Sequence, residues 1–206
     1  MKFILLICGM MISSGAWAHP VIYKGGTVYW GTFMPQMNIQ RLSYSFTSSF
    51  ALEFHTQNFR SIDSYRDYQL GANVLLKKWL FQNSQGNLYL GGYAGYFNSN
   101  LTEGMAYHAM AMGDWESRNV YTAASVDSYF YSGDSAFRYS YRLGLAPYTA
   151  DMGELQSWLV FKIDYFKKLN TDLMVTPMLR FFYRNVLWEI GSSLSGDIFL
   201  TLMVHY

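Results

Sequence analysis

The chain ends with the stretch Ile198-Phe199-Leu200-Thr201-Leu202-Met203-Val204-His205-Tyr206, and every second residue of it, from Ile198 to Tyr206, is aliphatic or aromatic. A period of two residues is that of a β-strand, whose successive side chains point to opposite faces. We therefore expect a terminal strand with one continuous apolar face.

The same period recurs upstream. Residues 41–47 and 50–57 each carry apolar side chains at every second position, and only Ser48-Ser49 separates the two runs. A two-residue separation between alternating runs predicts a β-hairpin. Further runs of this kind, separated by short polar turns such as residues 83–87, predict about ten strands in all.

Residues 98–117 are expected to form the longest loop. Residues 173–190 are predicted as one strand, with apolar Val175, Leu179, Phe181 and Tyr183 opposite Thr176, Arg180 and Arg184. The first strand of the chain is expected at residues 26–34. We find no internal repeat and no linker, which indicates one domain.

The composition limits the class of protein. Of the 206 residues, 51% are hydrophobic, 19% are aromatic and only 14% are charged, with a formal net charge of +1. This composition excludes a disordered chain, and the near-neutral charge argues against a nucleic-acid partner. After the first 18 residues no apolar run reaches 18 residues, so no membrane-spanning helix is predicted.

The first 18 residues have the pattern of a Sec-type signal peptide. Met1-Lys2 supplies a positive start, residues 3–12 are apolar, and Ala16-Trp17-Ala18 is a small-x-small cleavage site. Cleavage after Ala18 leaves a mature domain of residues 19–206. The only cysteine, Cys8, is removed with the leader.

Long alternating strands joined mostly by short turns predict an all-β fold, namely a closed antiparallel transmembrane β-barrel of about ten strands, with eight or twelve as alternatives. Aromatic residues at strand ends, such as Trp79, Trp158 and Trp188, suit the girdles at the membrane interface. The competing fold is a soluble periplasmic lipocalin-like barrel, in which the apolar face points inward.

The terminal strand resembles the C-terminal strand of Gram-negative outer-membrane barrels, which ends in an aromatic residue after alternating apolar positions. The resemblance implies that the barrel-assembly machinery recognises this strand, here through Ile198, Leu200, Leu202, Val204 and Tyr206. Tyr206 stands where Phe is commoner. Residues 181–191, followed by Gly196-Asp197, are also similar to the end of a group of small uncharacterised proteobacterial outer-membrane proteins. That group has no established activity.

Charged residues lie at the positions expected to face the lumen. A barrel of this size has an interior that side chains nearly fill, so opposite charges should pair across it. An open general porin is disfavoured for the same reason. The expected network consists of Arg41, Glu53, His55, Lys77, Asp127, Arg138, Arg142, Lys162, Asp164 and Arg180.

Two of these residues could also support catalysis. Glu53 and His55 project to the same face of a strand, and a His-carboxylate pair can serve as acid-base machinery. The sequence has no Gly-x-Ser-x-Gly motif to supply a nucleophile. A hydrogen-bonded filler of the lumen is the simpler interpretation of His55.

The expected loop at residues 98–117 is rich in soft metal ligands. Three thioethers and an imidazole, from Met105, His108, Met110 and Met112, are donors that select Cu(I) or Ag(I). Cleavage after Ala18 would add His19 at a new N-terminus, where an α-amine and an imidazole can chelate Cu(II). The competing interpretation is that these methionines are apolar fillers at the barrel mouth.

The sequence therefore predicts a non-enzymatic outer-membrane barrel that binds or passes a small solute, with a link to copper, silver or other metal tolerance. One alternative is an outer-membrane lipid-modifying enzyme, an acyl hydrolase or transferase that uses Glu53 and His55. The other is a soluble periplasmic binding barrel. The expected partners are outer-membrane lipids and, during biogenesis, periplasmic chaperones and the barrel-assembly machinery.

Overall fold

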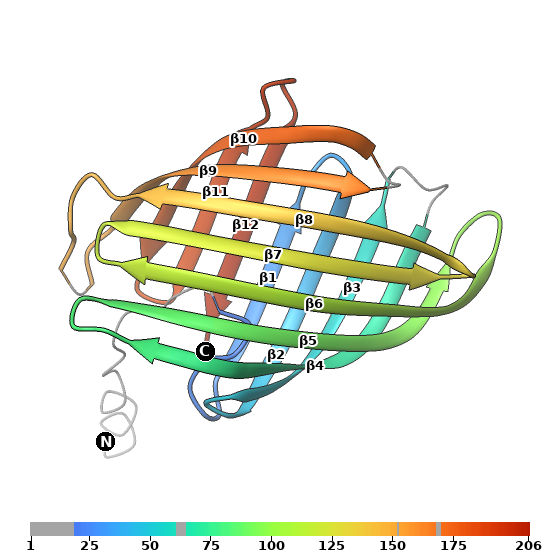
Figure 1. Cartoon of the computed structure of the whole chain (residues 1–206), viewed down its shortest axis with the longest axis horizontal. Helices are drawn as coiled ribbons and strands as arrows, with labels where there is room; N and C mark the ends of the chain where they lie inside the picture. The colour runs from blue at the N-terminus through green and yellow to red at the C-terminus, as the bar shows by residue number, and fades with distance from the viewer. Residues whose placement is uncertain (1–18, 61–64, 152, 168–169) are drawn as a thin grey trace, which may run out of the picture.

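The computed structural model describes residues 19–206 except 61–64, 152 and 168–169, so the predicted signal peptide lies outside the described residues. The described chain forms a single closed antiparallel barrel of twelve strands, in which each strand pairs with the next and β12 pairs with β1 (Figure 1). The strands are β1 (Thr27–Phe33), β2 (Met37–Thr47), β3 (Phe50–Phe59), β4 (Tyr65–Leu80), β5 (Ser84–Asn98), β6 (Glu103–Ser117), β7 (Val120–Tyr131), β8 (Asp134–Leu145), β9 (Gln156–Lys167), β10 (Asn170–Tyr183), β11 (Val186–Ser192) and β12 (Ile198–His205).

The two faces of the strands differ as the alternation predicts. On β2, Leu42 is 52% exposed on the outer face, whereas its neighbour Arg41 is 8% exposed and faces the lumen. Apolar side chains are exposed on the outer face of the other strands as well. An apolar exterior around a polar interior suits a barrel in lipid. The soluble lipocalin-like alternative, which requires the opposite arrangement, is wrong for this chain. Among the described residues, no helix is long and apolar enough to span a membrane.

Two strands were not predicted from the sequence. Residues 103–117 form β6 and not a loop, and the run 173–190 is divided into β10 and β11 by a two-residue turn at Arg184-Asn185. Arg184 takes a positive φ of 55°, which reverses the chain there. These two elements raise the number of strands from ten to twelve.

A β-bulge in β4 changes which side chains face the lumen. Leu75 pairs with Tyr89 but Lys77 pairs with Leu88, so the register shifts between Leu75 and Lys77. The extra residue turns the following side chains over. Lys77 is consequently exposed on the outer face, and its assignment to the lumen network is wrong.

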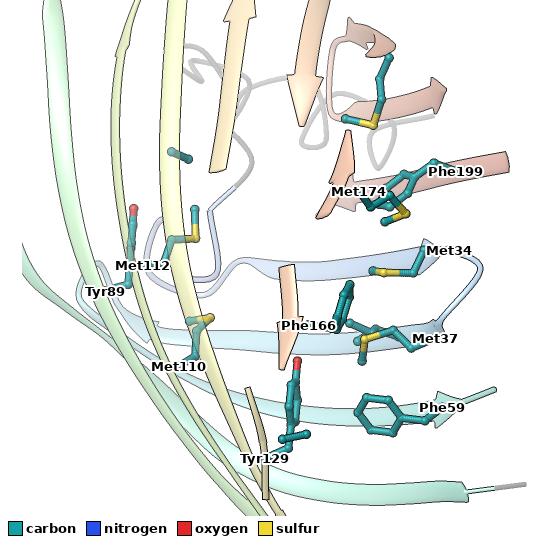
Figure 2. Packing of buried hydrophobic residues seen from close by; sticks show 14 of the residues in the cluster. Met34, Met37, Phe59, Tyr89, Met110, Met112, Tyr129, Phe166, Met174 and Phe199 are labelled. Atoms are coloured by element: carbon teal, nitrogen blue, oxygen red, sulfur yellow. The ribbon is translucent and has the colours of Figure 1, made fainter. Parts of the chain in front are cut away.

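The interior is layered along the barrel axis. We call the end where β1 begins and β12 ends the termini-side mouth, and the opposite end the far mouth. Buried apolar side chains cluster in the lumen at the far mouth, where the Phe59 ring lies 5.1 Å from that of Tyr65 and 5.3 Å from that of Tyr129. Figure 2 shows Met34, Met37 and Phe59 in this layer. Polar and charged groups occupy the lumen between the two mouths.

Candidate functional site

The candidate site is the charged section of the lumen. Its side chains come from alternate positions of neighbouring strands, and antiparallel pairing brings them level with one another. Arg41 on β2 pairs in register with His55 on β3, and Asp127 on β7 pairs with Arg138 on β8. The structure thus brings together residues far apart in sequence, as the expected network requires.

One group of contacts surrounds Glu53. Arg41 Nε lies 3.7 Å from Glu53 Oε1, and His55 Nδ1 lies 3.5 Å from the same oxygen. The Ser43 hydroxyl and the Asn73 amide donate to the other oxygen, Oε2, at 2.8 Å and 2.9 Å. Glu53 is 1% exposed, so these contacts replace the water that its charge would otherwise bind.

Two further carboxylates each bind two cations. Arg138 donates from Nε and Nη2 to Asp164 Oδ1 at 3.0 Å and 2.9 Å, and Lys162 Nζ lies 2.7 Å from Asp164 Oδ2. Glu189 accepts from Arg142 at 3.1 Å and from Arg180 at 2.8 Å. Arg138 and Lys162 thus bind a carboxylate of the predicted network, whereas Arg142 and Arg180 bind Glu189, which was not predicted.

A column of rings lies beside these ion pairs. His108 is sandwiched between Tyr93 and Tyr129, with ring centroids 4.9 Å and 4.6 Å apart and nearly parallel planes. Its Nε2 lies 2.9 Å from Asp127 Oδ1. His55 extends the column, 4.4 Å from Tyr93. His108 is thus a lumen residue and not part of a loop.

The four predicted ligands of the Met and His segment do not converge. On β6, Met105 is 54% exposed on the outer face, whereas His108, Met110 and Met112 face the lumen. The prediction of a loop that could fold around an ion is wrong, because a strand sends alternate side chains to opposite faces. In the part of the chain that the structure describes, no group of three His, Cys, Asp or Glu residues could hold a metal ion. His19 lies elsewhere, beside Asp114 near the termini-side end of β6.

Glu53 and His55 do not form an evident catalytic pair. The His55 ring makes polar contacts with the Glu53 carboxylate and with the Gln57 amide, and neither is a hydroxyl or thiol group that the ring could deprotonate. The nearby Ser43 hydroxyl donates to Glu53. His55 is wholly buried, so a substrate has no direct approach to its ring.

A cavity of about 70 Å³ opens beside the ion pairs. Its charged lining residues are Arg41, Asp127, Arg138 and Arg142, three guanidinium groups against one carboxylate. Trp30 and Tyr121 are among the other side chains that border it. The cavity is small, and most of the charged groups that line it are positive.

Several lumen residues are not among those predicted from the sequence. Asp114 and Glu116 fall in the segment predicted as a loop, which has no face assignment. Glu189 falls in the run predicted as one strand, and unbroken alternation through Arg184 would place it on the outer face. Asp67 follows the alternation of β4 and could have been found from it. It accepts hydrogen bonds from the Tyr65 hydroxyl and the Gln69 amide.

The terminal strand closes the barrel. Ile198, Leu200 and Leu202 are exposed on the outer face, and β12 pairs with both β11 and β1. Val204 is partly buried and Tyr206 is exposed at the end of the strand. The apolar face of the predicted assembly signal therefore points outward.

No family model matches the chain, and no curated protein matches it in sequence. The fold and the ion-paired lumen define a small β-barrel of the Gram-negative outer-membrane type. The chain is similar in structure to the KdgM porin, with a TM-score of 0.51 and 13% sequence identity over 88% of this chain and 98% of that one. One of the two KdgM structures is a complex with disordered oligogalacturonate.

Two longer chains match with TM-scores below 0.5. OccAB4 of Acinetobacter baumannii matches with a TM-score of 0.42 and 12% identity over 86% of this chain and 56% of that one. OccK5 of Pseudomonas aeruginosa matches with a TM-score of 0.43 and 12% identity over 82% of this chain and 57% of that one.

Proposed function

We propose that this barrel lets small anionic solutes, of the size and charge of sugar acids, cross the outer membrane. The observation that carries the proposal is the lining of the cavity, in which Arg41, Arg138 and Arg142 face Asp127. The similarity of the fold to that of the KdgM porin, which has been observed with oligogalacturonate, agrees with this proposal.

The arginines can bind a solute without losing their partners on the wall. A guanidinium has five N–H donors, and Arg142 uses Nη1 for both of its hydrogen bonds to Glu189. The remaining donors are available for a carboxylate that enters the cavity. A neutral solute would gain no such charge-assisted contact, so the lining favours anions.

Conductance in planar bilayers tests the proposal. We expect anion-selective channels, and we expect liposomes that contain the protein to take up galacturonate faster than galactose, a neutral sugar of similar size. The Arg142→Gln variant should shift the reversal potential toward cation passage. The Arg66→Gln variant is the matched control, because Arg66 is exposed on the outer face of β4. Cation selectivity in the parent, or equal shifts in both variants, would overturn the proposal.

Residence in the outer membrane is part of the same proposal, with a leader cleaved after Ala18 and insertion aided by the assembly machinery. Cell fractionation and N-terminal sequencing test it, with His19 expected as the first residue of the mature chain. Recovery in the soluble periplasmic fraction would contradict it. The link to copper or silver tolerance gains no support from the geometry, because Met105 lies on the opposite face from Met110 and Met112.

A further inference from the structure

The segment that precedes β1 enters the termini-side mouth of the barrel. Val21 is 4% exposed and belongs to the same buried apolar cluster as the lumen residue Met112. The Ile22 amide donates to Ser45 Oγ at 3.1 Å, and the Gly25 amide donates to the Ser45 carbonyl at 2.7 Å. Ser45 faces the lumen near the end of β2, so residues 19–24, here called the N-terminal segment, are attached to the inner wall.

His19 is held by two carboxylates. Its Nδ1 lies 3.3 Å from Asp114 Oδ2 and its Nε2 lies 3.6 Å from Glu116 Oε1, and both carboxylates are buried on β6. The ring also packs on Tyr89 of β5, with centroids 5.6 Å apart. One imidazole therefore places both of its nitrogens toward negative groups.

The two carboxylates beside His19 stabilise the protonated, positively charged form of its ring. Burial by itself lowers the pKa of His19, but the contacts with Asp114 and Glu116 outweigh it and raise the pKa to about 9. Tyr89 of β5 and His205 of β12 are the other titratable groups near the ring. Without a positive partner, Asp114 and Glu116 would be two buried carboxylates facing the same side of one strand, which is unfavourable.

The N-terminal segment lies between the arginine-lined cavity and the termini-side mouth. Asp114 is the next lumen-facing residue of β6 after Met112, and Met112 borders the cavity. Glu116 pairs in register with Tyr121, which also borders the cavity. His19 and Val21 therefore lie in the lumen on the termini side of the cavity, with His19 against β5 and β6.

We propose that the N-terminal segment is a plug that closes the termini-side mouth of the barrel and is held in place by the ion pairs of His19 with Asp114 and Glu116. The consequence for conductance rests on the proposed function, whereas the seating of the plug can be measured without it. Displacement of residues 19–24 opens the route to the cavity.

Thiol labelling of the protein in outer-membrane vesicles tests the seating. Cysteines are introduced separately by Val21→Cys and by Tyr23→Cys, the second serving as the matched control because Tyr23 is 56% exposed in the same segment. At neutral pH we expect iodoacetamide to react with the Val21→Cys variant at least tenfold more slowly than with the Tyr23→Cys variant. Adding Asp114→Asn and Glu116→Gln to both variants should bring the two rates close together.

Equal labelling rates for the Val21→Cys and Tyr23→Cys variants that retain Asp114 and Glu116 would show that the N-terminal segment does not lie inside the mouth. A slow rate at position 21 that survives the loss of both carboxylates would overturn the role of the ion pairs. The electrophoretic shift on heating in detergent confirms that each variant is a folded barrel.

Bilayer recordings test the closure. The His19→Ala and Asp114→Asn/Glu116→Gln variants should show higher open probability than the parent, while the Tyr23→Ser variant should match it. Conductance that is equal in all of them overturns the plug as a gate. If none of the proteins conducts, the proposed function fails, and the labelling rates still decide whether the segment is seated.

Discussion

Lys162 Nζ lies 2.7 Å from Asp164 Oδ2, and both side chains are completely buried on the lumen face of β9. Asp164 is bound at the same time by Arg138 through its other oxygen. One carboxylate thus binds two cations inside the barrel, as Glu189 also does. The Lys162 ammonium also lies 3.8 Å from the centre of the Phe199 ring, a cation–π contact.

The Asp164→Leu substitution should destabilise the barrel by about 3 to 5 kcal/mol, because it leaves two buried cations without their carboxylate. Urea unfolding in lipid vesicles measures the effect. Adding Lys162→Met should recover part of the loss, since one of the unpaired charges is then removed. A cost below about 1 kcal/mol for the single variant would show that water reaches these groups and that the pairing is dispensable.

The Phe161→Arg substitution tests the outer face. Phe161 is the neighbour of Lys162 on β9 but is exposed on the opposite side of the strand. An arginine near the bilayer midplane costs about 2 to 4 kcal/mol in a transmembrane barrel. Leu194→Arg is the control, because Leu194 is 80% exposed in the connection between β11 and β12. Similar unfolding free energies for the two variants would contradict the assignment of faces.

Two neighbouring glycines should respond differently to an added methyl group. A Cβ at Gly71 would overlap with the Gly92 carbonyl and with the ring of Tyr93, its partner in register on β5, whereas a Cβ at Gly92 would meet no atom within 4 Å. Gly71→Ala should cost about 1 to 3 kcal/mol, as expected for overpacking. Gly92→Ala should leave the urea midpoint nearly unchanged. Equal midpoints would contradict the close approach of β5 to Gly71.

The attachment of the N-terminal segment should weaken at alkaline pH. The pKa of His19 is raised to about 9 in the folded protein, above its ordinary value of 6.5. The stabilisation by the His19 ion pairs is therefore complete below about pH 6.5 and is lost as the pH rises through about 9. The ratio of labelling rates for Val21→Cys and Tyr23→Cys should rise over this range, and the ratio removes the common effect of thiol ionisation. A ratio that stays constant to pH 10 would contradict the prediction.

Where the alternation was unbroken, local sequence was sufficient to predict the fold. In residues 41–57 polar and apolar side chains alternate, so both the hairpin and the faces of Arg41, Glu53 and His55 were predicted correctly. In β6 the inward residues Met110 and Met112 are apolar, like those on the outer face, and the period is masked. Local sequence therefore could not identify this strand or its inward side.

One extra residue in β4 made the predicted face of Lys77 wrong. The bulge between Leu75 and Lys77 depends on how β4 pairs with β5, so it could not be predicted from the sequence of β4 alone. The turn at Arg184-Asn185 is likewise brief and lacks the glycine that usually marks a positive φ.

The sequence by itself determined that this chain forms an antiparallel barrel with an apolar exterior and a charged lumen, because the side-chain period of a strand is a local property. Only the tertiary structure decided which charges meet. Arg142 on β8 binds Glu189 on β11, and His19 reaches Asp114 on β6. Such partners are separated by many residues and come together only when the sheet closes and fixes the stagger of its strands. Closure of the barrel therefore creates the arginine-lined cavity and places the N-terminal segment between that cavity and the termini-side mouth.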